Sequence, residues 1–111
     1  MELKRDDALL RISLLEMDNA VVAFFYEGKI GLGTLAVALQ RSGELRAQTS
    51  SVLLGGRFLL VSRSLAERVS AAFGKMSLVS VRTSLPEGEA LRSFSKLFED
   101  LLLKRSKTQR H

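Results

Sequence analysis

The sequence predicts an α+β fold in which an antiparallel sheet of five or six strands is backed by two helices on one face. Four apolar segments with strand periodicity come first, followed by a helix, a further strand and a second helix, in the order β-β-β-β-α-β-α. Each helical segment has a single apolar stripe, and short breaks join the first helix to the strands on either side. Such a helix must lie back across the sheet that these strands form.

The first two strands are expected at residues 8–16 and 20–26. Residues 8–16 alternate between apolar and mixed positions, as a half-buried strand does, and Asp18-Asn19 forms a turn pair. Residues 20–26 (AVVAFFY) are apolar on both faces. A strand of this kind needs cover on both sides, and the helices supply only one. The other face is therefore expected to meet a second sheet or another molecule.

A link bounded by glycines, residues 28–31, separates this strand from a second alternating run at 32–40, which predicts a hairpin. A turn at 41–44 leads to a fourth strand over residues 45–54. The first helix covers about 58–73 and ends at Gly74, where a left-handed cap is expected.

The remaining segments are a strand over 76–83 and a closing helix. Ser84 and Glu87 have the spacing of a capping box, while Gly88 shifts the expected helix start toward Glu87. The apolar stripe of this helix consists of Leu91, Phe94, Leu97, Phe98, Leu101 and Leu102.

The net charge of +5 is concentrated at one end of the chain. Residues 104–111 hold four basic side chains and no acid, which leaves +1 for residues 1–103 (5 − 4). We therefore expect one domain over 1–103 and a flexible basic tail over 104–111. An alternative hypothesis is a small nucleic-acid-binding module that uses this tail, although the aromatic residues 24–26 have no basic neighbours in their strand.

We expect a non-enzymatic protein with no catalytic residue, cofactor or metal site, although the composition alone leaves lysine and carboxylate chemistry open. There is no cysteine, and the only histidine is His111. Thiol chemistry, a serine–histidine–aspartate triad and a histidine metal site all lack their residues. The charged start and the absence of an apolar run near ~20 residues favour a cytoplasmic location without a membrane partner.

One motif keeps an enzyme hypothesis open. Gly31-Leu32-Gly33-Thr34-Leu35-Ala36 matches the dinucleotide-binding pattern and follows an apolar strand. The motif requires a helix to begin there and an acid about 20 residues later, and residues 50–63 contain no acid. A glycine-bounded hairpin is the favoured interpretation, with a nucleotide-binding enzyme fragment as the alternative.

Several stretches, taken in order and spacing, resemble the eukaryotic proteasome assembly chaperones 3 and 4. The matching stretches are residues 18–26, Gly33-Thr34-Leu35-Ala36-Val37-Ala38, Ser51-Val52-Leu53-Leu54-Gly55, Leu65-Ala66-Glu67-Arg68, residues 75–81 and the closing helix through Leu91, Phe94, Leu97 and Phe98. The C-terminus, Thr108-Gln109-Arg110-His111, lacks the hydrophobic-Tyr-X ending of chaperones 1 and 2, in agreement with the 3/4 type.

The resemblance implies a non-catalytic chaperone that dimerises, with itself or a paralogue, and docks on α-subunits of the 20S proteasome during ring assembly. The dimer seam is then expected on the sheet face away from the helices, with Val22, Phe24 and Val37 contributing. Candidate partner contacts are Lys29 and Ile30 at the expected hairpin tip, and Arg57, which stands where the family has polar or acidic residues.

Overall fold

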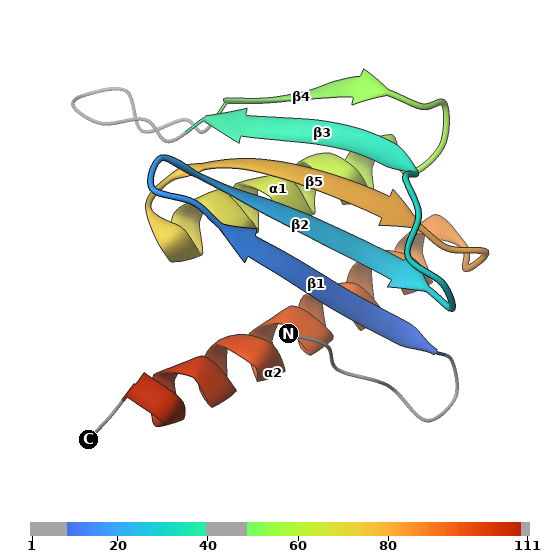
Figure 1. Ribbon diagram of the computed structural model, residues 1–111. Coiled ribbons are helices and arrows are strands. Elements are labelled where there is room, and N and C mark those ends of the chain that lie inside the picture. The colour runs from blue at the N-terminus through green and yellow to red at the C-terminus, as the bar shows by residue number, and fades with distance from the viewer. Residues whose placement is uncertain (1–8, 40–48, 110–111) are drawn as a thin grey trace.

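A computed structural model of the chain describes residues 9–39 and 49–109 (Figure 1). The elements are β1 (Leu10–Glu16), β2 (Ala20–Glu27), β3 (Thr34–Leu39), β4 (Thr49–Leu54), α1 (Leu59–Phe73), β5 (Met76–Arg82) and α2 (Glu87–Gln109). The predicted α+β class and element order are confirmed. Both helices lie on the same side of one five-stranded sheet, behind the strands in Figure 1.

The strands lie in the order β1-β2-β5-β3-β4. β1 pairs antiparallel with β2, and β3 pairs antiparallel with both β5 and β4, whereas β2 and β5 are parallel. The sheet is therefore mixed rather than antiparallel throughout. The cause is the crossover through α1, which returns the chain to the sheet as β5 in the same direction as β4. β5 then enters beside β2, which runs the same way.

The insertion of β5 also changes the connection between β2 and β3. These strands are antiparallel but not adjacent, so the hairpin predicted for 20–26 and 32–40 does not form as a paired unit. The loop over residues 28–33 instead crosses the end of β5 (Figure 1). Gly33 donates its N–H to the hydroxyl of Ser80 at 2.9 Å, and a Cβ at Gly33 would overlap the carbonyl oxygen of Val81. This close crossing requires glycine.

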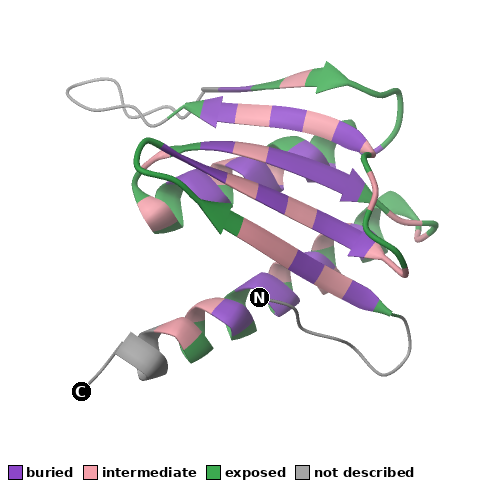
Figure 2. Cartoon of the chain, in the orientation of Figure 1, coloured by how far each residue is buried: buried purple, intermediate pink, exposed green. Residues whose placement is uncertain are grey.

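The hydrophobic core lies between the sheet and the helices (Figure 2). Phe25 on β2 contacts Phe94 and Phe98 of α2 edge to face, with ring centroids 5.6 and 6.0 Å apart. Burial of one such side chain stabilises the fold by about 1.5–3 kcal/mol. Fully buried aliphatic residues complete this layer: Ile12, Val21, Val61, Leu65, Val69, Val79 and Leu101.

The ends of α1 are stabilised in two different ways. Gly74 adopts the predicted left-handed conformation, with φ of 66°, and its N–H donates to the carbonyl oxygen of Ser70 at 2.8 Å. At the other end, the N–H groups of Leu60 and Val61 donate to the carboxylate of Glu87 at 3.0 and 3.3 Å. The first turn of α2 therefore caps α1 from outside the helix.

The predicted capping box of α2 does not form. The helix begins at Glu87, as Gly88 indicated, but the Ser84 hydroxyl donates to Glu27 and the Glu87 carboxylate is engaged by α1. Each side chain instead binds a polar group of another element, the carboxylate of Glu27 for Ser84 and the N–H groups of the first turn of α1 for Glu87. These polar groups would otherwise lack a partner.

Helix α2 continues through the position where the basic tail was expected to begin. It extends to Gln109, and Arg105 lies over the ring of Phe73 at 4.6 Å while its Nη2 is 3.3 Å from a carboxylate oxygen of Glu16. The boundary expected at residue 104 therefore falls inside the helix. Residues 110–111 and the start of the fourth predicted strand, 45–48, lie outside the described residues.

Candidate interaction surface

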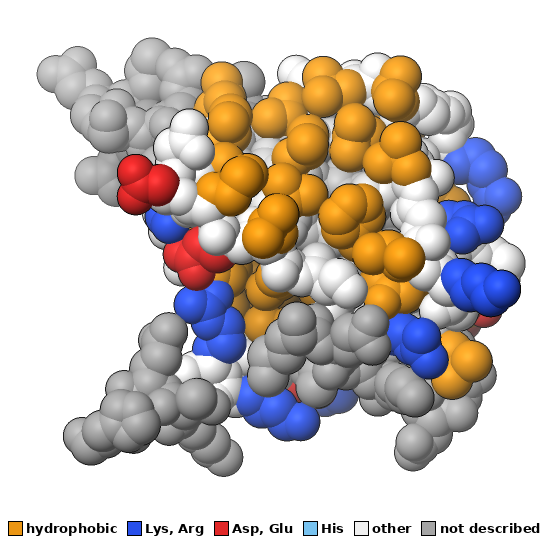
Figure 3. All heavy atoms as spheres, in the orientation of Figure 1, with side chains coloured by type: hydrophobic (Ala, Val, Ile, Leu, Met, Phe, Trp, Pro, Cys, Tyr) orange, Lys and Arg blue, Asp and Glu red, His pale blue; other side chains and the backbone are white. Residues whose placement is uncertain are grey.

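The sheet face opposite the helices carries a continuous set of apolar side chains, which we call the open face. Strand alternation and register define its members as Leu15, Val22, Phe24, Leu35, Val37, Leu39, Leu53, Leu54, Met76 and Leu78. Figure 3 views the molecule from this side, and hydrophobic side chains cover most of the visible sheet. Exposed apolar areas of this kind mark binding surfaces in soluble proteins.

Strand register aligns these side chains in rows across the sheet. Val22 and Val37 both lie opposite Leu78, and Leu15 lies opposite Val22, so one apolar row crosses four strands. Such directly opposed side chains contact one another and share the burial of their apolar surface. The row is consequently one surface, although its members come from widely separated parts of the sequence.

An irregularity in β4 adds two leucines to the open face. The register of β3 and β4 shifts between Leu35 and Ala36, so that Leu35 pairs with Leu54 while Ala36 pairs with Val52. Leu53 is the extra residue, and a bulge of this kind directs neighbouring side chains toward the same face. Leu53 and Leu54 are 53% and 55% exposed.

No element within residues 9–39 and 49–109 covers the open face, and both described helices lie on the opposite side. Val22, Phe24 and Val37 are half-buried by their neighbours in the sheet, while Leu15 is 58% exposed. The expectation that β2 is covered on one side only is therefore confirmed for the described part of the chain.

The open face becomes polar and basic toward one end. Arg11, Tyr26 and Arg82 form the row at that end, and the Tyr26 hydroxyl lies 3.2 Å from the Ser13 hydroxyl. Among the described strand residues of this face, the charged side chains are both arginines. The face therefore combines an apolar centre with a positively charged end.

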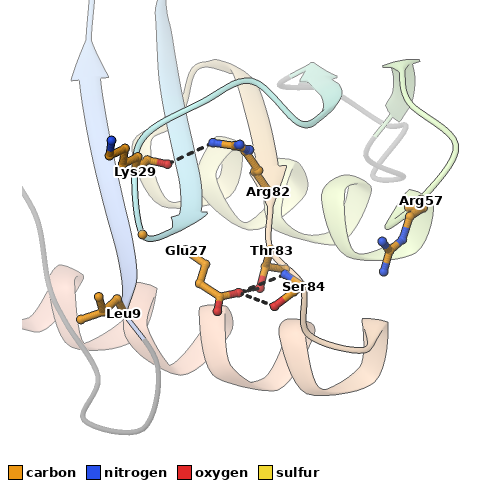
Figure 4. Close-up of a pocket in the computed structure, with 8 residues that line it drawn as sticks. Leu9, Glu27, Lys29, Arg57, Arg82, Thr83 and Ser84 are labelled. Atoms are coloured by element: carbon orange, nitrogen blue, oxygen red, sulfur yellow. Dashed lines mark hydrogen bonds between the residues drawn. The ribbon is translucent and has the colours of Figure 1, made fainter.

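The sequence-predicted site residues divide into two groups in space. Val22 and Phe24 on β2 and Val37 on β3 all lie on the open face, and β5 lies between these two strands. Lys29 and Arg57, from loops far apart in the sequence, line one hollow at the basic end of the sheet (Figure 4). Ile30, beside Lys29, is 54% exposed.

The glycine motif has a structural role in this fold. Residues 34–36 of the motif belong to strand β3, so a helix does not begin there. Gly31 and Gly33 lie where the 28–33 loop crosses β5, and a Cβ at Gly31 would overlap the guanidinium of Arg82. The dinucleotide-binding pattern is thus explained by the close crossing of a loop over a strand.

Two acidic side chains have a lowered pKa, and each is held at an end of the sheet. The Lys75 ammonium, 2.9 Å away, is the main cause of the lowered pKa of Glu16, and Arg105 contributes further. The N–H of Ser84 and then the hydroxyl of Thr83 lower the pKa of Glu27. Both carboxylates serve as anchors between elements, at 2.9–3.3 Å for Glu16 and 2.7–3.0 Å for Glu27.

Three further observations concern metal binding, membrane crossing and similarity to known proteins. Among the described residues, no group of three or more acidic or histidine side chains is placed to hold a metal ion, and His111 lies outside them. Neither described helix combines the length and apolar character required to cross a membrane. No protein-family model matches the chain, and no curated protein matches it either.

The sequence reasoning missed several members of the open face. Leu78 and Met76 could have been found from the alternation of the β5 segment, in which they are opposite in phase to the buried Ser77 and Val79. Leu54 could not, because the bulge that brings it to the same face as Leu53 depends on how β4 pairs with β3. Strand order, which the sequence does not encode locally, decides which apolar residues become neighbours.

Proposed function

We propose that this chain is a non-catalytic binding protein that dimerises through its open face, in the manner of the assembly chaperones it resembles. The observation that carries the proposal is the apolar sheet face described above, which no described element covers. Covering about 1,200–2,000 Å² in total would be ordinary for a stable dimer. The partner is a second copy of the chain or a paralogue.

The resemblance indicates which protein the dimer would bind, and we call that protein the client. In this proposal the dimer works in the cytoplasm, where it binds α-subunits of the 20S proteasome and holds them until neighbouring subunits arrive. Binding rests on shape and charge, and no covalent step is needed. The basic end of the open face, with the hollow that Lys29 and Arg57 line, is the surface we assign to client contact.

The proposal is tested by substituting Val37, which lies in the central apolar row. Native mass spectrometry and light scattering should find a dimer for the wild type and a monomer for Val37→Lys, because a buried, unpaired ammonium is strongly unfavourable. We expect the dissociation constant to rise at least about a hundredfold. Leu103→Lys on α2, where Leu103 is 62% exposed, is the matched control and should remain dimeric.

A second measurement tests the client. Purified α-subunits encoded by the same genome are mixed with the wild-type chain, and the complex is isolated by size-exclusion chromatography. We expect a complex that contains two copies of the chain with at least one α-subunit. A wild-type chain that stays monomeric at high micromolar concentration and ignores every α-subunit would overturn the proposed function.

A further inference from the structure

A groove surrounds Arg57 at the end of the sheet where β2 and β5 terminate. Its largest hollow, about 660 Å³, is bordered by Leu9, Lys29, Arg82 and Ser84 as well as by Arg57. Two neighbouring hollows of about 340 and 360 Å³ also have Arg57 in their walls, and they extend the groove past the β4–α1 corner to the start of α1. The three hollows therefore form one groove around Arg57.

Three cations, Lys29, Arg57 and Arg82, line this groove, and contacts with neighbouring groups position the two arginines. Arg82 Nη1 lies 3.3 Å from the carbonyl oxygen of Lys29, and the guanidinium of Arg57 stacks on the ring of Phe58 at 4.8 Å. In Figure 4, Arg57 lies across the hollow from Lys29, with Arg82 and Thr83 between them. Within the described residues none of the three cations forms an ion pair.

The acids of the groove accept hydrogen bonds from other groups and do not pair with these cations. Glu27 accepts hydrogen bonds from Thr83 and Ser84, and Glu87 accepts hydrogen bonds from the first turn of α1. Both carboxylates are thus already bound by uncharged donors. The lining residues carry three positive and two negative charges, and the three positive groups remain available for charge-assisted hydrogen bonds to a ligand.

Exposed apolar side chains border all three hollows, at both ends of the groove and at Leu32 in the middle hollow. Leu9, 53% exposed, borders the largest hollow, while Leu59 and Leu60, 47% and 65% exposed, border the hollow at the start of α1. A bound anion of a few atoms would leave these leucines in water. An extended segment with acidic residues at its centre and apolar residues at its ends would cover them.

We propose that this groove binds an extended acidic peptide segment of a partner protein, with its carboxylates on Arg57, Arg82 and Lys29 and its apolar flanks on the leucines. The inference rests on the proposed function and deepens it, because it specifies the chemistry of the client segment. It assigns that segment to the basic end of the sheet, so the apolar centre of the open face remains the dimer interface.

The test is fluorescence anisotropy with the full chain and a labelled peptide, Leu-Glu-Asp-Glu-Leu. Its neutral counterpart, Leu-Gln-Asn-Gln-Leu, measures the contribution of charge. We expect the acidic peptide to bind more tightly and to weaken as salt is added. Arg57→Gln and Arg82→Gln should each weaken binding about tenfold, the effect of losing one charge-assisted contact.

Arg68→Gln is the matched control, because Arg68 lies on the outer side of α1, 3.9 Å from Glu99, and away from the groove. It should leave binding of the acidic peptide unchanged. Equal binding of the two peptides, or equal effects of Arg57→Gln and Arg68→Gln, would overturn the inference. Binding of an oligothymidine of about 20 nucleotides that depends on Arg57, without binding of the acidic peptide, would overturn it in favour of a nucleic-acid site.

Native mass spectrometry of the same samples separates this inference from the proposed function. If the peptide fails to bind a chain that is dimeric and captures α-subunits, the groove assignment is wrong and the proposed function stands. If the peptide binds in an Arg57-dependent way to a chain that is monomeric and ignores α-subunits, the groove assignment stands and the proposed client is wrong.

Discussion

Glu27 shows how one side chain joins segments that are distant in the sequence. It ends β2, and one of its carboxylate oxygens accepts hydrogen bonds from the Thr83 hydroxyl at 2.7 Å and from the Ser84 N–H and hydroxyl, both at 3.0 Å. The Ser84 N–H first, and the Thr83 hydroxyl second, hold the pKa of Glu27 below its ordinary value of 4.5. The interaction fixes the loop that leads from β5 into α2.

The lowered pKa of Glu27 predicts a specific dependence of stability on pH. The unfolded chain binds this proton more readily than the folded chain, so the carboxylate stabilises the fold above pH 4.5 and loses that effect as the pH falls through its folded-state pKa. In urea unfolding, Glu27→Gln should be less stable than the wild type at pH 7. The difference should shrink as the pH falls below about 4.5.

Thr83→Val provides a control for this pH dependence. It removes one donor to Glu27, so the folded-state pKa should move back toward the ordinary value and the pH-dependent loss of stability should become smaller. A constant stability difference between wild type and Glu27→Gln from neutral to acidic pH would contradict this account. Sequence reasoning did not single out Glu27, because its partners lie 56 and 57 residues away.

At the scale of elements, hydrophobic periodicity was sufficient to find every described strand and helix. The stripe of α1 and the left-handed Gly74 came directly from residue spacing, since both depend on neighbours within one or two turns. Strand pairing was harder to predict. The parallel pair of β2 and β5 arises because β5 enters between two strands that are consecutive in the sequence, and local patterns contain no information about that choice.

The crossing of the 28–33 loop over β5 predicts an asymmetry between two glycines. Gly33→Ala should reduce the free energy of unfolding by about 2–3 kcal/mol, because the added methyl group overlaps the Val81 carbonyl oxygen and forces β3 and β5 apart. Gly56→Ala is the control, since no atom lies within 4 Å of the position of its added Cβ. Urea denaturation measures both, and equal stability of the two variants would contradict the crossing described here.

At the scale of the whole molecule, the sheet has two apolar faces and the described chain covers one. The residues of β2 predicted this imbalance, because that strand is apolar on both sides. The extent of the open face was not predictable in the same way. Its central row joins Leu15, Val22, Leu78 and Val37 from four strands, and its edge depends on a bulge in β4.

A chain that covers its second face by dimerisation must show stability that depends on its own concentration. The wild-type melting temperature should rise by about 3–5 °C for each tenfold increase in protein concentration, for a dimer of this size. Leu78→Ser, which places a hydroxyl at the centre of the apolar row, should weaken the dimer. Its melting temperature should therefore begin to rise only at a higher protein concentration than that of the wild type. In Val37→Lys the melting temperature should be constant, because a monomer unfolds without a change in molecularity. A wild-type melting temperature that is also constant over the same concentration range would mean that the open face does not bind a second copy of the chain.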